Sequence, residues 1–162
     1  MGTGAYVIFH VGGVSCALAR ECVHKVLPLP AMGRPPGLPA VVEGILDLAG
    51  KAIPVLRFDR LFGLSAQPLH AYRHLILLSS GEPPLALLVD RATDVLRVPA
   101  ERIMPLHRGE TFNGCVAGHI ATADGLIHLL SMERLLDRRE QEVLVEFQTT
   151  QQRRLEEMRG IP

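Results

Sequence analysis

The chain has 162 residues and a mass of 17.7 kDa, which is enough for one domain with its own buried core. Hydrophobic residues make up 48%, yet aromatic residues only 4%, so the core must be mainly aliphatic and a base-stacking surface is not indicated. The formal net charge is zero, and this balance disfavours nucleic acid as a partner.

The chain contains no apolar run long enough to span a bilayer, and its first residues lack the basic and apolar segments of a secretion signal. Its three cysteines, Cys16, Cys22 and Cys115, are an odd set without C-x-x-C spacing. Such a set favours a reducing compartment over a disulfide scaffold. We therefore expect a cytoplasmic protein without membrane insertion.

Short apolar runs between turn residues predict β-strands over most of the chain. Residues 6–11 and 14–18 flank Gly12-Gly13 and predict a first hairpin. Residues 20–27 fit either a helical turn or a strand, and both remain open. The prolines and glycines of residues 28–39 predict an exposed loop, because such a segment holds neither a helix nor a central strand.

Residues 41–48 and 52–58 flank Ala49-Gly50-Lys51 and predict a second hairpin. Pro54 lies in the second of these strands and has no N–H to donate. We therefore expect this strand at a sheet edge or a bulge.

Further along, three apolar runs predict a meander: 74–78, 85–89 and 93–98. Residues 116–121 and 126–130 flank Asp124-Gly125 and predict a tight hairpin. Ser131 is a candidate N-cap for a short helix that ends at Leu136.

Residues 137–162 are charged and Gln-rich, and they predict a helix that forms a C-terminal extension to a domain of residues 1–136. Leu144, Phe147, Leu155 and Met158 fall near one stripe, which Gln151 interrupts. This narrow stripe fits packing on the chain's own β-structure as well as pairing with another chain.

No residue pattern indicates catalysis. Ser15 follows Gly13 as in a nucleophile elbow, but the second glycine and the strand-to-helix context are missing, so a structural serine is favoured. Residues 33–37 lack the Gly-Lys-Ser/Thr that a phosphate-binding loop needs. Asp90, Asp94 and Glu101 are best read as solvated strand or turn residues.

A metal site is the remaining chemical alternative. His10, Cys16, Cys22 and His24 are close in sequence, but they lack the ligand spacing of a zinc clip. His119 and His128 lie on opposite sides of the Asp124-Gly125 turn and are expected to face each other as an ordinary cross-strand pair. We therefore expect no catalytic residue, metal or cofactor.

Residues 39–63 read P-A-V-V-E-G-I-L-D-L-A-G-K-A-I-P-V-L-R-F-D-R-L-F-G. This segment resembles the CheW-like chemotaxis coupling family, whose pattern is approximately P-x-x-x-x-G-(V/I)-x-N-L-R-G-x-x-x-P-V-x-D-L-R-x-x-x-G. Residues 85–96 are similar to the family's G-x-x-V-D-x-V-x-(D/E)-V-L run, and residues 115–136 resemble its closing hairpin and short helix. The resemblance covers roughly residues 5–136.

The resemblance implies a mostly β fold of two small five-stranded SH3-like barrel lobes that share a core, followed here by the helical extension. It also implies a non-catalytic scaffold that couples chemoreceptors to the regulatory domain of a histidine kinase in a signalling array. The positions that it assigns to the kinase side are Val23, Lys25 and Gly44. The positions that it assigns to the chemoreceptor side are Ala49, His74 and Val95.

Several positions depart from the family pattern. Asp47 replaces its Asn, and Ala49 replaces the Arg of N-L-R-G, which removes a guanidinium able to hydrogen-bond a partner. Ser131 replaces an acidic residue of the closing segment. Arg57 and Asp59 exchange the acidic and basic positions of P-V-x-D-L-R, and this exchange is expected to preserve an internal ion pair.

Two functional alternatives stand beside the coupling adaptor. The first is a self-associating or inhibitory CheW-like scaffold that uses residues 137–162 and is not coupled to ordinary chemoreceptors. The second is an enzyme or metal protein built around His10, Cys16, Cys22 and His24.

Overall fold

The computed structural model describes residues 2–64, 74–79, 84–105, 115–136 and 138–159. The strands of the first half are β1 (Thr3–Val11), β2 (Val14–Ala19), β3 (Val23–Pro28), β4 (Val42–Leu48) and β5 (Lys51–Arg57). Those of the second half are β6 (His74–Leu78), β7 (Ala86–Val89), β8 (Arg91–Pro99), β9 (Ile103–Pro105), β10 (Val116–Thr122) and β11 (Gly125–Leu130). The α-helices are α1 (Phe58–Leu61) and α2 (Arg138–Arg159), and short 3₁₀ helices cover Arg20–Cys22, Ala100–Arg102 and Met132–Arg134.

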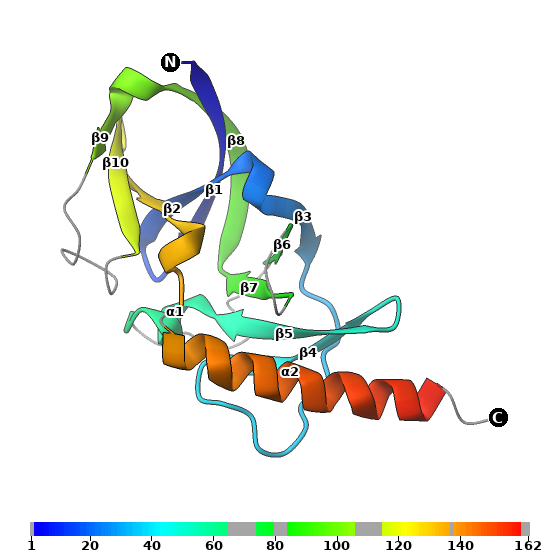
Figure 1. Cartoon of the computed structure of the whole chain (residues 1–162). Coiled ribbons are helices and arrows are strands. Elements are labelled where there is room, and N and C mark those ends of the chain that lie inside the picture. The colour runs from blue at the N-terminus through cyan, green and yellow to red at the C-terminus, as the bar shows by residue number, and fades with distance from the viewer. Residues whose placement is uncertain (1, 65–73, 80–83, 106–114, 137, 160–162) are drawn as a thin grey trace.

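The strands form two sheets (Figure 1). Sheet A has six strands in the order β8-β1-β2-β11-β10-β9, and sheet B has five in the order β3-β6-β7-β5-β4. Most neighbours are antiparallel, but β2 pairs with β11 and β5 pairs with β7 in parallel. The expected mostly β fold of two lobes with a C-terminal helix is confirmed, and sheet A has one strand more than the expected five.

One large core joins the two sheets. Phe9 of β1 and Phe58 of α1 are fully buried and meet edge to face, with ring centroids 5.4 Å apart. Leu18 of sheet A and Leu88 of sheet B belong to the same core cluster. A second, smaller cluster around Ile8 fills the inside of sheet A. Because the larger cluster takes side chains from both sheets, the lobes share a core as expected.

The predicted hairpin turns are confirmed. Gly12 and Gly13 form a two-residue loop between β1 and β2, with φ angles of 56° and 79°. Ala49 and Gly50 form the equivalent loop between β4 and β5, with φ angles of 51° and 88°. Positive φ at both loop residues defines the type I′ turn, which matches the right-handed twist of paired strands.

Two expectations are wrong in part. Strands β6 and β7 pair, but β8 leaves them and pairs with β1 in sheet A, so the three strands do not form one meander. Ser131 precedes a 3₁₀ turn and makes no side-chain capping bond to it. The open segment 20–27 contains both alternatives, since a 3₁₀ helix at Arg20–Cys22 leads directly into β3.

Pro54 does not lie in an edge strand, because β5 is between β7 and β4. However, β7 reaches only Val55, Leu56 and Arg57. The side of β5 that faces away from β4 is therefore not paired with β7 at Pro54, where a proline has no N–H to contribute. Strand β5 is therefore interior, but at Pro54 one of its two sides has no strand partner, as the missing N–H of proline requires.

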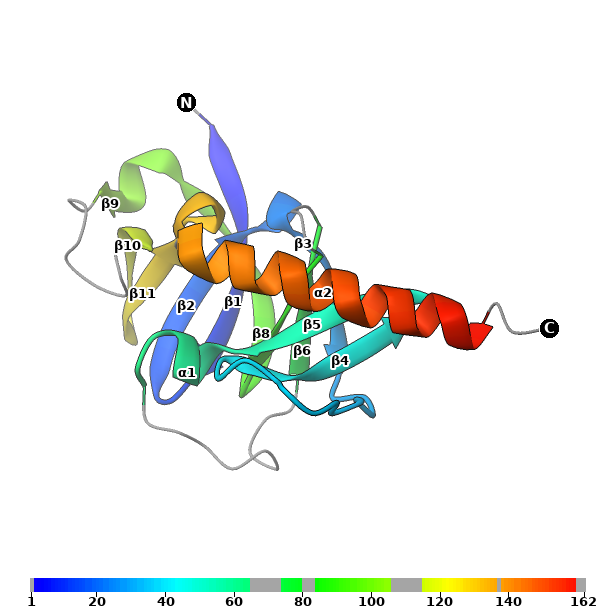
Figure 2. The same ribbon diagram turned by 60° about the horizontal axis from the view of Figure 1, so that its bottom comes forward.

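Helix α2 runs along sheet B and continues beyond it, with its C-terminal end away from the body (Figure 2). Leu144 is 1% exposed and joins the large core, whereas Met158 is 74% exposed. The helix therefore packs on its own chain, through Leu144 in its first half and through Gln152, which hydrogen-bonds β5, in its second. Packing on the chain's own β-structure is one of the two alternatives left open by the sequence. Among the described residues, no helix has the length and apolar character required to cross a membrane.

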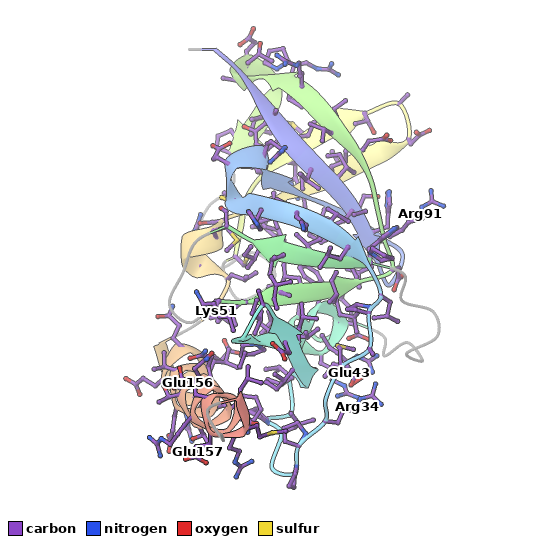
Figure 3. The ribbon with its side chains drawn as sticks, turned by 90° about the vertical axis from the view of Figure 1, so that its right-hand side faces the viewer. Arg34, Glu43, Lys51, Arg91, Glu156 and Glu157 are labelled. Carbon is purple, nitrogen blue, oxygen red and sulfur yellow. The ribbon has the colours of Figure 1, made fainter. Side chains whose placement is uncertain are left out.

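A chain of charges crosses sheet B at its β4 edge. Arg57 pairs with Asp59 at 2.8 Å, and the expected internal pair is therefore present, although Asp59 lies in α1 and not on the strand. Arg57 also lies 3.6 Å from Glu43, which is 3.9 Å from Arg34 of the proline-rich loop. Figure 3 labels Arg34 and Glu43 side by side. These charges tie the loop to β4 and β5.

Candidate functional site: a groove between the two sheets

A groove of about 410 Å³ lies where the edge strand of sheet B meets the edge strand of sheet A. One wall is β3, which contributes Val23, His24, Lys25 and Val26. The other wall is β8, which contributes Ala92, Asp94 and Val95. The groove therefore combines residues that are about 70 positions apart in the chain and belong to different lobes.

The groove presents apolar side chains to solvent. Val95 is 57% exposed and Val26 is 38% exposed, one on each wall. Lys25 and Asp94 are exposed beside them and supply one charge of each sign. Exposed apolar residues rimmed by polar ones mark surfaces at which proteins bind other proteins.

Local structure explains why successive β3 residues reach the groove. The register between β3 and β6 shifts between Val23 and Lys25, so His24 is an extra residue in the strand. Such a bulge re-aims side chains and increases the local twist. The Arg20 guanidinium donates to the Val23 carbonyl at 3.1 Å and fixes the turn that leads into β3.

His74 does not line the groove but is hydrogen-bonded to the backbone of its β8 wall. It begins β6 and is partly buried, and its Nδ1 accepts a hydrogen bond from the Ala92 N–H at 3.1 Å. Ala92 itself lines the β8 wall. Of the residues that the family resemblance assigns to partners, Val23, Lys25 and Val95 thus line one groove, and His74 contacts its wall.

Gly44 and Ala49 lie elsewhere, on the β4–β5 hairpin. Gly44 is buried beneath the proline-rich loop: a Cβ at this position would be 2.8 Å from the Gly33 carbonyl oxygen. Its φ angle is not positive, so the close approach of the loop, and not backbone freedom, explains the glycine. Ala49 is exposed at the hairpin tip, where the Asp47 carboxylate accepts a hydrogen bond from the Gly50 N–H at 3.0 Å.

Several groove residues were not assigned to a partner from the sequence, among them Arg20, Val26 and Asp94. Strand alternation gave no signal for Val26, because the bulge at His24 shifts the inside-outside pattern of β3. Arg20 and Asp94 belong to segments that meet only in the folded chain.

The remaining candidate chemical groups do not form a reactive cluster. Cys16 and Cys115 are fully buried, and burial raises the pKa of the Cys16 thiol to about 12 and that of Cys115 to about 11. Both are therefore protonated at neutral pH and are poor nucleophiles. Within the described ranges, no group of three or more His, Cys, Asp or Glu side chains is arranged to hold a metal ion.

The histidines in this part of the fold pair locally. His10 Nδ1 is 3.0 Å from the hydroxyl of Ser15, which faces it across the first hairpin. His119 and His128 face each other as expected, with 2.9 Å between His119 Nε2 and His128 Nδ1. Burial and the neighbouring His119 lower the pKa of His128.

Comparison with known proteins identifies the domain. A family model described as the CheW-like domain matches residues 5–140. The chain belongs to the CheW-like domain family. The match extends from β1 into the first residues of α2, so it includes both sheets and the groove but leaves most of α2 outside.

Two relatives agree with this assignment. The chain is 25% identical over 96 residues to a chemotaxis protein CheW of Thermotoga maritima, a match that covers 59% of this chain and 63% of that protein. It also matches the crystal structure of the scaffolding protein TtCheW from Thermoanaerobacter tengcongensis with a TM-score of 0.72. That alignment has 24% identity and covers 85% of this chain and 89% of the other. The resemblance to the CheW-like family is therefore confirmed by the family model, and the solved structure agrees with the fold.

Proposed function

We propose that this CheW-like chain is a non-catalytic cytoplasmic adaptor that couples chemoreceptors to a histidine kinase. The observation that carries the proposal is the groove in which edge strands of the two lobes meet. An adaptor has to bring two partners next to each other, and a groove with walls from different lobes provides adjacent surfaces. The activity requires no cofactor.

Each wall of the groove suits one partner. The β8 wall exposes Val95, which the family resemblance assigns to the receptor, and an exposed apolar side chain in a groove is what seats the apolar face of a helix. The β3 wall carries Val23 and Lys25, assigned to the kinase. We propose that receptor and kinase regulatory domain bind these two walls and so come into contact with each other.

The test measures both partners against matched variants. Val95→Asp should weaken binding of a receptor-tip fragment at least about tenfold, because it places a charge in an apolar contact. Lys25→Glu should weaken binding of the kinase regulatory domain. Leu126→Asp is the control, because Leu126 is 49% exposed on β11 and does not line the groove. If the unmodified chain binds neither partner at micromolar concentration, the coupling function is wrong.

The hairpin tip supplies a second test on the receptor side. Ala49 stands where the family pattern has Arg, and the residue is exposed. Ala49→Arg should strengthen receptor binding, because a guanidinium can donate several hydrogen bonds to a partner. If the affinity for the receptor fragment is unchanged, residue 49 is not part of the receptor-binding surface.

The alternative of a self-associating scaffold has less support. It requires the apolar stripe of α2 to be exposed for contact with a second chain. Leu144, however, is buried in the core of its own chain, and Phe147 packs against the same cluster. Sedimentation of the intact chain as a monomer at high concentration would exclude this alternative.

A further inference from the structure

The edge of β5 that faces away from β4 is only half covered by another strand. Strand β4 pairs with β5 from Leu48↔Lys51 to Val42↔Leu56, whereas β7 pairs only with its last three residues. The backbone groups of Gly50 and Ala52 on the far side of β5 therefore lie outside the ladder. Ala52 is 1% exposed, so its peptide groups need partners other than water.

Two glutamines of α2 supply these partners. The Ala52 N–H donates to Gln152 Oε1 at 2.8 Å, and Gln148 Nε2 donates to the Ala52 carbonyl at 3.0 Å. Gln152 Nε2 also donates to the Gly50 carbonyl at 3.0 Å. A side-chain amide has the donor and the acceptor of a peptide group. Gln152 uses both on the strand edge, as a residue of a neighbouring strand would, and Gln148 contributes a donor to the Ala52 carbonyl.

The spacing of the two glutamines fits this role. Residues four apart on a helix are neighbours on one face, about 5–6 Å apart. Strand residues that point to the same side are about 6.6 Å apart, since each residue adds about 3.3 Å. Gln148 and Gln152 thus match the repeat of the strand edge, and Gln148 Nε2 is also 3.4 Å from Gln152 Oε1.

We propose that Gln148 and Gln152 form a clamp that positions the β4–β5 hairpin tip for its partner. The clamp holds Gly50 and Ala52, which flank the tip residue Ala49 on its β5 side. The family match ends at residue 140, so the clamp lies outside the matched domain and acts on the segment that carries the family signature. The inference rests on the proposed function for the identity of the partner but not for the clamp itself.

The clamp is tested by exchanging one glutamine and its neighbour. Gln152→Leu removes the bonds to Ala52 and Gly50 while it keeps a side chain of similar size. The Ala52 amide should then exchange with solvent at least about tenfold faster under native conditions. Gln151→Leu makes the same chemical change one position away, where no hydrogen bond to the hairpin is found among the described residues. In that variant the Ala52 exchange rate should not change.

A second variant separates the hydrogen bond from helix packing. Gln152→Glu keeps an oxygen acceptor for the Ala52 N–H but loses the donor to the Gly50 carbonyl and to Glu156, so it is made together with Glu156→Gln to avoid two adjacent carboxylates. Slow exchange at Ala52 should therefore be retained in Gln152→Glu. Equally fast exchange in the Leu and Glu variants would mean that docking of the helix, and not the amide, protects Ala52, and the clamp would be wrong.

Binding of the receptor-tip fragment tests positioning. Gln152→Leu should weaken it roughly threefold to tenfold, because the hairpin tip must then be ordered on binding. If Ala52 exchanges faster in Gln152→Leu but the affinity for the receptor fragment is unchanged, the glutamines only satisfy the backbone of β5. The positioning role would then be wrong. If the unmodified chain binds no receptor fragment, the proposed function fails, while the exchange comparison still decides whether the clamp exists.

Discussion

Arg57 and Asp59 form a two-point ion pair inside the protein. Arg57 Nε donates to Asp59 Oδ1 at 3.1 Å, and Arg57 Nη2 donates to Asp59 Oδ2 at 2.8 Å. Asp59 is 0% exposed and Arg57 is 4% exposed. Asp59 also accepts the Arg60 N–H at 2.8 Å, so the pair joins the end of β5 to the first turn of α1. Buried charges of this kind are costly unless paired, and their geometry determines whether they contribute to stability.

Removal of one partner of this pair should destabilise the fold strongly. Asp59→Leu takes the nearer of two carboxylates from a buried guanidinium, and we expect a loss of about 3 kcal/mol in the free energy of unfolding. Urea denaturation measures this loss. The double variant Arg57→Met, Asp59→Leu should recover part of it, because it removes both charges of the pair but also takes Arg57 from Glu43. A loss below about 1 kcal/mol for the single variant would contradict the prediction.

The hairpin tip should become more stable with glycine. Ala49 has φ of 51°, a left-handed conformation that costs an L-residue about 1–2 kcal/mol. Glycine removes this cost but loses about 0.5–1 kcal/mol of chain entropy, so Ala49→Gly should stabilise the fold by roughly 0.5–1 kcal/mol. Ala123→Gly, at a tip residue whose φ is not positive, should not stabilise. Thermal unfolding of both variants makes the comparison, and equal shifts would argue against strain at Ala49.

Gly44 should tolerate no side chain. A Cβ would lie 2.8 Å from the Gly33 carbonyl oxygen and 3.2 Å from Met32 Cβ, both in the proline-rich loop. Gly44→Ala should therefore displace the loop and destabilise the fold by about 1–3 kcal/mol. Gly2→Ala is the control, because nothing lies within 4 Å of a Cβ there. A fully stable Gly44→Ala protein would show that the loop moves freely away from β4.

The His119–His128 pair should make stability depend on pH. Burial and His119 lower the pKa of His128 below the ordinary histidine value of about 6.5. At His128 the unfolded chain therefore binds a proton more readily than the folded chain. The contribution of His128 to the free energy of unfolding is fully present above about pH 6.5, and it falls as the pH decreases toward the folded-state pKa. His128→Gln should flatten this decline in urea midpoints measured between neutral and mildly acidic pH. A decline as steep in His128→Gln as in the unmodified chain would contradict the prediction.

Local features of the fold could be predicted from the sequence because local residues determine them. Gly12-Gly13 specifies a type I′ turn through its φ angles, and His74–Leu78 is an apolar run that became β6 without a change of boundary. The family signature in residues 39–63 likewise fixed the second hairpin. In each case the deciding interaction lies within a few residues.

Features that depend on distant strands could not be predicted. No residue in Arg91–Pro99 indicates that β8 pairs with β1 and not with β7, because either pairing buries the same apolar alternation. The groove could not be predicted for the same reason, since Val95 and Lys25 lie close together only because β8 pairs with β1. Gln148 and Gln152 appeared as polar residues of a charged helix, and their role depends on the short reach of β7.

The strand order of sheet A affects how this chain is made in the cell. β2 pairs in parallel with β11, so the sheet joins residues near the start of the chain to residues 125–130. During synthesis, β1 and β2 leave the ribosome long before their neighbours β8 and β11 exist. Strand pairings between such distant parts of the chain form slowly. Until β8 and β11 pair with them, β1 and β2 have unpaired edges, which are prone to aggregation. Sheet A can therefore close only after residues 125–130 have been synthesised, whereas sheet B, built from the contiguous strands β3–β7, is available earlier.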